Sequence, residues 1–170
     1  VEQTTSTGKP KIRCIDDFLK SLVNGAVSVF HRIQMDSIPM LLLLLSTIFM
    51  AVPSSVVLLC KSDFSAAYRS LPILLAHLQF ADILFYDSVL AQWRIASQFA
   101  MPFGAVAAVY AWDRLGGAVT AILRRLFLFP LLRYVDDLFG LCIGDDPQHD
   151  RNILLEIVDL FGLRLDPDKT

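Results

Sequence analysis

Residues that build disulfide frameworks and metal sites are scarce in this sequence, which has three cysteines and three histidines among 170 residues. The cysteines form no Cys-x-x-Cys pair and have no histidine at ligand spacing, which argues against a zinc site and a disulfide scaffold. We therefore interpret Cys14, Cys60 and Cys142 as reduced core residues of an intracellular protein. The polar opening shows no secretory signal peptide, and without an initiator Met we expect a fragment.

The sequence also lacks an excess of positive charge, because 15 Lys and Arg residues stand against 17 Asp and Glu residues. The net charge of −2 excludes a global basic field for nucleic acid, so any such binding has to come from local clusters. Charged residues make up only 19% of the chain and hydrophobic residues 55%, with a mean hydropathy of +0.54. This composition predicts either a large buried core in one domain or an apolar surface that a missing part covers.

The segment 37–60 has no charged side chain and contains five consecutive leucines. Such a density of apolar residues raises the alternative of a membrane protein that spans at 37–60. Pro39 and Pro53 interrupt the segment, whereas spanning requires continuous length, so a membrane partner is not expected. We favour a buried helix near 38–51 and a buried strand near 56–60, where two valines follow each other.

Two adjacent carboxylates, Asp136 and Asp137, lie between short apolar runs within residues 131–143. This pattern indicates a β-hairpin with the acids at its bend. Successive strand residues point to opposite faces, so at least one carboxylate should project outward, where it could bind a hard cation. For an isolated pair, ordinary turn chemistry is the open alternative, because Asp is common in turns.

A third carboxylate, Asp63, follows the strand expected near 56–60. A strand end holds a side chain rigidly and opens to solvent, which suits a metal ligand. The alternative is a helix N-cap, because Asp is a preferred capping residue and residues 64–67 could begin a helix.

The remaining segments predict a mixture of helices and strands. Period-two alternation from Lys11 to Phe18 indicates a half-exposed strand, after a lead-in over residues 1–10 that we expect to be flexible. A long helix is expected over 105–127. Another helix should begin at Asp146-Pro147, which supply a cap and a first helical residue, and end at Gly162.

In their order along the chain, these segments resemble the fingers and palm of a reverse transcriptase of retrotransposon type. The matching motifs are Lys11-Ile12-Arg13, Asp63 with Tyr68-Arg69, Met101-Pro102-Phe103-Gly104, Tyr134-Val135-Asp136-Asp137, and Gly162-Leu163 to Lys169. Each motif is short, but the order is specific and spans nearly the whole chain. Phe103 stands where retroviral enzymes usually carry Gln, which favours a retrotransposon, and Ala66 stands where they often place Asp.

The resemblance implies an α+β fold, a polymerase palm of the split βαββαβ, ferredoxin-like kind over 37–170 with partial fingers over 1–36 and no thumb. The implied activity is that of an RNA-directed DNA polymerase, a nucleotidyltransferase that extends a primer on an RNA or DNA template with deoxynucleotides. Further partners would be the missing thumb and a nuclease domain of the same polyprotein. The isolated fragment is expected to be inactive, and the protein is expected in the cytoplasm or nucleus.

The resemblance also assigns roles to single residues. Asp63, Asp136 and Asp137 would be catalytic and would hold two Mg²⁺ ions, with Mn²⁺ as an alternative; the first two would bridge the metals and Asp137 would support them. The implied nucleotide site consists of Arg13 and Lys11 at the triphosphate, Tyr68 as the steric gate against a 2′-hydroxyl, Phe103 and Gly104 in the pocket, and Lys169 near the pyrophosphate.

Two alternatives remain beside this interpretation and the membrane protein. One is a catalytically inactive relic of such a domain. The other is an RNA-directed RNA polymerase, for which Tyr68 is less suited because it fits deoxynucleotide selection.

Replacing Tyr68 by Ala in the full reading frame should relax the exclusion of ribonucleotides, because the side chain that blocks the 2′-hydroxyl is removed. The ratio of kcat/KM for a deoxynucleotide over its ribonucleotide should fall by about 100-fold. Tyr86→Ala, outside the motifs, serves as the control. An unchanged ratio in Tyr68→Ala would remove the gate role from this residue.

Overall fold

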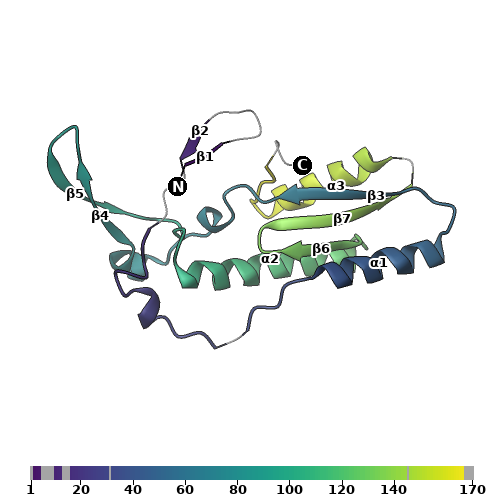
Figure 1. The fold of residues 1–170 in the computed structure, drawn as a ribbon, viewed down its shortest axis with the longest axis horizontal. Helices are drawn as coiled ribbons and strands as arrows, with labels where there is room; N and C mark the ends of the chain where they lie inside the picture. Colours follow the sequence, from purple (N-terminus) through teal and green to yellow (C-terminus); the bar gives the residue numbers. More distant parts are fainter. Residues whose placement is uncertain (1, 5–9, 13–15, 31, 145, 167–170) are drawn as a thin grey trace. The chain divides into compact units, whose positions relative to one another are not determined.

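The computed structural model describes the chain except residues 1, 5–9, 13–15, 31, 145 and 167–170 (Figure 1). It divides into two compact units, unit 1 with Val1–His31 and Tyr68–Ala111, and unit 2 with Arg32–Ala67 and Trp112–Thr170. Both units are discontinuous in sequence, whereas the predicted fingers and palm are continuous segments. The predicted α+β class is confirmed, because helices and antiparallel strands both occur.

Unit 2 is built on a three-stranded antiparallel sheet with the order β3-β7-β6. The strands are β3 (Val57–Asp63), β6 (Leu131–Tyr134) and β7 (Asp137–Ile143). A loop of two residues joins β6 to β7, which confirms the predicted hairpin. The sheet therefore places the end of β3 beside the bend of the hairpin.

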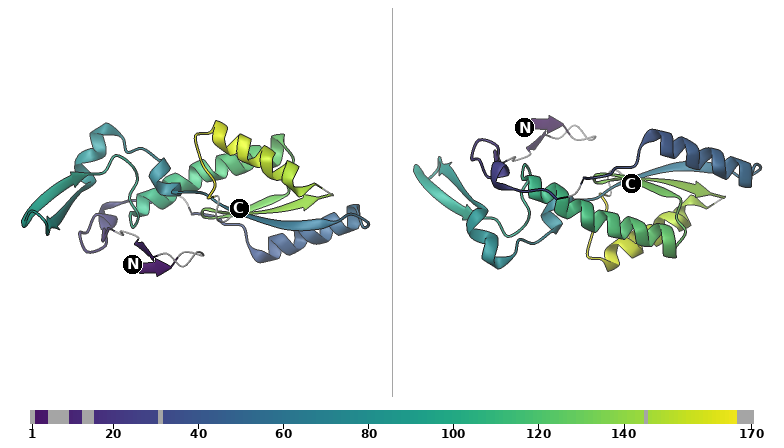
Figure 2. Two further views of the ribbon diagram at one scale, coloured as in Figure 1. Left: turned by 90° about the horizontal axis from the view of Figure 1, so that it is seen from above. Right: turned by 90° about the horizontal axis from the view of Figure 1, so that it is seen from below.

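Three helices pack around this sheet. They are α1 (Ile38–Ala51), α2 (Val106–Leu126), which belongs to unit 2 from Trp112 onward, and α3 (Pro147–Leu160). Figure 2 shows α2 and α3 on one face of the sheet and α1 on the other. The helices predicted over 38–51 and 105–127 are thus confirmed to within one residue at each end.

The start and end of α3 follow from local capping chemistry. The Asp146 carboxylate accepts a hydrogen bond from the backbone N–H of His149 at 3.1 Å, and Pro147 occupies the first turn. Gly162 has a φ of +68°, the left-handed conformation that glycine adopts readily after a helix. The predicted cap and stop signal are both confirmed.

The core of unit 2 lies between the sheet and the two helices on its covered face. Its largest fully buried side chains are Trp112, Val119, Leu123, Leu138 and Val158. The first three share one side of α2, which is the amphipathic pattern of a helix packed on a core. By length and composition α2 is also the one helix in the described part of the chain that could cross a membrane, a test that buried core helices pass as well.

The uncharged segment 37–60 forms a helix and a strand as predicted. With 14 residues, α1 is shorter than the about 20 that a membrane span needs. The whole of β3 pairs with β7, so the strand is part of the sheet. The prediction that residues 56–60 are buried is wrong, because Leu58 is 42% and Leu59 60% exposed. Most of the apolar side chains of α1 are exposed, including Ile38, Leu42, Leu43, Phe49 and Met50. The prediction that this helix is buried is wrong, because its sequence is apolar on all sides and only one side faces the sheet.

Unit 1 contains two small antiparallel sheets. In the first, β1 (Glu2–Thr4) pairs with β2 (Pro10–Ile12). The prediction of a flexible lead-in is therefore wrong for residues 2–4 and 10, since a three-residue strand depends on a partner that local sequence does not reveal. The strand predicted from Lys11 ends at Ile12, and residues 16–18 are not in a strand.

The second sheet of unit 1 is formed by β4 (Asp82–Asp87) and β5 (Gln92–Ser97). Three short 3₁₀ segments complete the order of elements, η1 (Asn24–Ala26), η2 (Ala67–Ser70) and η3 (Leu75–Phe80). The predicted turn over residues 101–104 is found directly before α2. It places Phe103 and Gly104 in a loop.

Two of the three cysteines are free thiols on neighbouring strands of unit 2. The sulfur atoms of Cys60 and Cys142 lie 2.8 Å apart. Burial, with the neighbouring Cys60 thiol as the second cause, raises the pKa of Cys142 to about 12. The thiolate is the nucleophilic form, so Cys142 is not suited to covalent catalysis at neutral pH. Cys14 lies outside the described residues.

Replacing Leu123 by Ala should destabilise unit 2, because this side chain is fully buried and its removal leaves a cavity. The free energy of unfolding should fall by about 2–5 kcal/mol. Leu126→Ala is the matched control, since Leu126 lies in the same helix and is 73% exposed. Chemical denaturation of the two variants measures the difference, and equal stabilities would contradict the placement of Leu123 in the core.

Candidate functional site

The three predicted catalytic carboxylates come from two neighbouring strand ends of unit 2. Asp63 is the last residue of β3 and lies in register opposite Asp137, the first residue of β7. Asp136 occupies the loop before it, and its carbonyl accepts a hydrogen bond from the backbone N–H of Phe64 at 2.9 Å. The strand pairing thus joins residues far apart in sequence.

The environment of these carboxylates is partly closed. Asp63 is 6% exposed, while Asp136 and Asp137 are half-buried. The carbonyl of Asp63 also accepts a hydrogen bond from the backbone N–H of Asp166 at 2.7 Å, which brings the C-terminal segment to the same strand end. The alternative of Asp63 as the N-cap of an α-helix is wrong, because residues 64–66 do not continue into one and a 3₁₀ turn begins at Ala67.

Lys61 adds a positive charge beside the hairpin. Its ammonium group lies 3.0 Å from the carboxylate of Asp137 and 5.7 Å from the ring centre of Phe139. Both partners are exposed enough for solvent to screen the pair, so its contribution to stability is small. Its effect on the site is local, because the charge of Asp137 is partly compensated before any cation binds.

The carboxylates could supply only part of the ligands of a hard divalent cation, so water or a substrate has to supply the other oxygens. Within the described residues, no group of three or more His, Cys, Asp and Glu side chains could hold a metal ion. Mg²⁺ is usually held by one or two carboxylates together with phosphate oxygens and water. Asp63 and Asp136 lie on chain segments joined by the backbone hydrogen bond from Phe64 to Asp136, and Asp137 is engaged by Lys61, so two carboxylates remain for such an arrangement.

Unit 1 contains the predicted nucleotide-pocket residues Tyr68, Phe103 and Gly104. The rings of Tyr68 and Phe103 meet edge to face, with centroids 5.2 Å apart and planes at 80°. Such a contact is favourable and fixes the orientation of both rings. Gly104 is exposed and has a φ of +94°, a conformation that is strained for any residue with a side chain.

Asn24 holds the loop that carries Phe103 and Gly104. Its side-chain amide donates to the carbonyl of Gly104 at 2.9 Å, and its side-chain oxygen accepts from the backbone N–H of Val106 at 2.9 Å. No role was predicted for Asn24 from the sequence. In the structure its side chain fixes the loop by two hydrogen bonds, which suits an amide because it both donates and accepts hydrogen bonds.

Three predicted nucleotide-binding groups lie outside the described residues. They are Arg13, Lys169 and the side chain of Lys11. The carboxylates belong to unit 2, whereas Tyr68, Phe103 and Gly104 belong to unit 1. Each group is therefore defined within its own unit.

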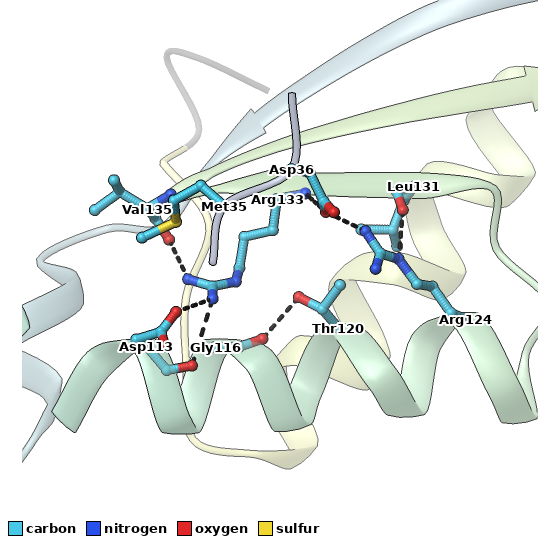
Figure 3. Close-up of polar contacts among 9 residues, drawn as sticks. All are labelled: Met35, Asp36, Asp113, Gly116, Thr120, Arg124, Leu131, Arg133 and Val135. Atoms are coloured by element: carbon cyan, nitrogen blue, oxygen red, sulfur yellow. Dashed lines mark hydrogen bonds and ion pairs between the residues drawn. The ribbon is translucent and has the colours of Figure 1, made fainter. Parts of the chain in front are cut away.

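A cluster of polar residues around Arg133, where the hairpin packs on α2, was not predicted from the sequence (Figure 3). The Arg133 guanidinium is 6% exposed and pairs with the carboxylate of Asp113 at 2.6 Å. Asp36 accepts a hydrogen bond from the backbone N–H of Arg133 at 2.8 Å and forms an ion pair with Arg124. A signal was available, because an arginine inside an apolar strand requires a partner when it is buried.

The chain matches no known family of proteins and no sequence among the curated proteins.

Replacing Lys61 by Gln should strengthen binding of a divalent cation, because the ammonium group competes with the cation for the Asp137 carboxylate. For an exposed pair the gain in Mn²⁺ affinity should be about threefold at low salt. Lys20→Gln removes a comparable exposed lysine from unit 1 and is the control. Titration with Mn²⁺, followed by water proton relaxation, measures the affinity, and an unchanged or weaker affinity would contradict this role of Lys61.

Proposed function

We propose that unit 2 is the palm of an RNA-directed DNA polymerase of retrotransposon type. The observation that carries the proposal is the register of β3 and β7, in which Asp63 lies opposite Asp137 at the bend of a hairpin. The motif order in the sequence requires these carboxylates to meet. A strand pairing that brings them to one end of a sheet supports that requirement.

The connectivity of unit 2 supports a palm of the split βαββαβ kind. The elements follow one another as β3, α2, β6, β7 and α3, and the strand order β3-β7-β6 puts the last strand between the first two. Leu165 then forms an antiparallel bridge to Phe64, directly after β3. This bridge gives the chain after α3 the position of a fourth strand beside β3.

In the proposed reaction the primer 3′-oxygen bonds to the α-phosphorus of a deoxynucleotide, the bond to pyrophosphate breaks, and the hydroxyl proton passes to water. Two Mg²⁺ ions, when bound, stabilise the attacking and leaving oxygens. Asp63 and Asp136 would hold them, and Asp137 would support the site from its pair with Lys61. The carboxylates' fixed positions limit the reorganisation that the reaction requires.

Selection of the nucleotide is proposed for unit 1. Tyr68, held edge-on by Phe103, would pack against the sugar and exclude a 2′-hydroxyl. Gly104 would let the backbone approach the nucleotide or template, with Asn24 holding the loop. Arg13 is proposed for the triphosphate, because one guanidinium group can bind two phosphate oxygens at once, and Lys11 would add a positive charge there. Lys169 is proposed for the pyrophosphate.

The proposed partners follow from this chemistry. A primer annealed to an RNA or DNA template, deoxynucleotides, and a thumb and nuclease domain of the same polyprotein would complete the enzyme. The proposed location is intracellular, in the cytoplasm or nucleus, where these substrates occur. The retention of all three acids favours an active enzyme over a relic.

Asp136→Asn in the full reading frame should abolish primer extension on an RNA template with deoxynucleotides and Mg²⁺. Neutralising a carboxylate that holds the metals removes several kcal/mol of transition-state stabilisation, which corresponds to a loss of roughly a thousandfold in kcat. Asp159→Asn, on the exposed side of α3, is the matched control and should extend normally.

Primer extension by Asp136→Asn at the wild-type rate would contradict the metal role of this residue. Failure of the wild type with the full reading frame would instead support an inactive relic.

A further inference from the structure

Val135, between Tyr134 and Asp136, has an unfavourable backbone conformation. Its φ is +55°, the left-handed region that residues with branched side chains avoid. Two-residue hairpin loops usually carry Gly, Asn or Asp where φ is positive. A valine persists in this conformation only if the surrounding structure holds it, and such residues cluster at functional sites.

Three contacts hold the peptide groups of Val135. The indole N–H of Trp112 donates to its carbonyl at 2.8 Å, and the Arg133 guanidinium donates to the same oxygen at 2.8 Å. The backbone N–H of Val135 points to the sulfur of Met35 at 3.4 Å. Figure 3 shows the contacts of Val135 with Arg133 and Met35. The donors to the carbonyl come from α2 and β6, so the loop is fixed from outside itself.

The guanidinium of Arg133 is itself held in place. Its second nitrogen donates to the Asp113 carboxylate at 2.6 Å, so both ends of the planar group are engaged (Figure 3). Gly116 makes room for it, because a Cβ at this position would lie 3.2 Å from the guanidinium. Lysine could not replace this arrangement, since one ammonium group lacks the rigid fork of donors.

Trp112 links the hairpin to the end of β3. Its side chain is 1% exposed and meets the ring of Phe64 edge to face, with centroids 5.0 Å apart. Phe64 follows Asp63, and its backbone N–H binds the carbonyl of Asp136. One buried indole therefore contacts both chain segments that carry the proposed catalytic carboxylates.

We infer that Trp112 and Arg133 are positioning residues, which hold Val135 in its left-handed conformation and thereby set the direction of the Asp136 carboxylate toward Asp63. We call these two residues the clamp. Its catalytic role rests on the proposed function, whereas its effect on the hairpin does not. Both side chains are buried, at 1% and 6% exposed, so neither would touch the substrate. Their contribution is to keep two strand ends in one geometry before a metal binds.

The test is Trp112→Phe in the full reading frame, which removes the indole N–H and keeps an aromatic ring against Phe64. Amide hydrogen exchange in peptides covering residues 134–138 should accelerate by about tenfold, because one hydrogen bond to the loop is lost. Exchange elsewhere in unit 2 should stay unchanged. Trp93→Phe, an exposed tryptophan in β5, is the matched control and should leave the hairpin unaffected.

Rescue distinguishes positioning from general support of the fold. Trp112→Phe should also weaken Mn²⁺ binding, because the Asp136 carboxylate is no longer held in one direction. Adding Val135→Gly should restore most of the lost Mn²⁺ affinity and kcat, because glycine adopts a positive φ without the clamp. In Trp112→Phe alone, kcat should fall by about tenfold with little change in KM for the deoxynucleotide. Arg133→Lys, which keeps the charge beside Asp113, is a second variant and should accelerate the same exchange.

Each result decides a separate point. Unchanged exchange at the hairpin in both Trp112→Phe and Arg133→Lys would overturn the clamp. Acceleration spread evenly over unit 2, without rescue by Val135→Gly, would also overturn it in favour of a purely structural role. If exchange accelerates only at the hairpin and Val135→Gly restores Mn²⁺ affinity, while the wild type extends no primer, the result would support the clamp and reject the polymerase.

Discussion

The antiparallel pairing of β3 with β7 is the constraint on which unit 2 depends. It sets Asp63 against Asp137 and Lys61 within ion-pair distance of the same carboxylate. A slip of one residue would turn these side chains to the face that α2 and α3 cover, because strand residues alternate between faces. Burial of Leu138 and Cys142 on the covered face opposes such a slip. The arrangement of the acids is therefore a consequence of core packing.

Buried charges connect strand β6 to helix α2 and to the segment before α1. Removing Arg133 and Asp113 from water is costly, and the cost is offset only where the pair is well hydrogen-bonded. Here the guanidinium bonds to both Asp113 and the carbonyl of Val135. Asp36 connects the segment before α1 to β6 through the backbone of Arg133. These bonds specify one position of β6 against α2, which uniform apolar contacts would leave less defined.

In unit 1, a similar use of few polar groups orders the loop before α2. Asn24 bonds to residues on both sides of the turn, and the paired rings of Tyr68 and Phe103 stand beside it. The loop can therefore carry an exposed glycine with a positive φ and still keep a defined shape. A preorganised loop of this kind would suit the selection between closely similar sugars that we propose for unit 1.

Local sequence determined much of the secondary structure. Prolines and caps set the ends of α1 and α3, the two apolar runs around Asp136 and Asp137 set the hairpin, and the strand before Asp63 formed where valines favoured it. These features depend on residues a few positions apart, so a pattern in the chain suffices to indicate them. The acids at the bend and the strand end were recognisable for the same reason.

Only the tertiary structure decided how these pieces meet. The register that pairs Asp63 with Asp137, the burial of Arg133 with Asp113, and the positive φ of Val135 all depend on partners distant in the chain. The exposure of α1 and the pairing of β1 were mispredicted because burial and short strands depend on what packs nearby. A local pattern states which residues can pair or be buried, and the free energy of packing the whole chain selects which of them do.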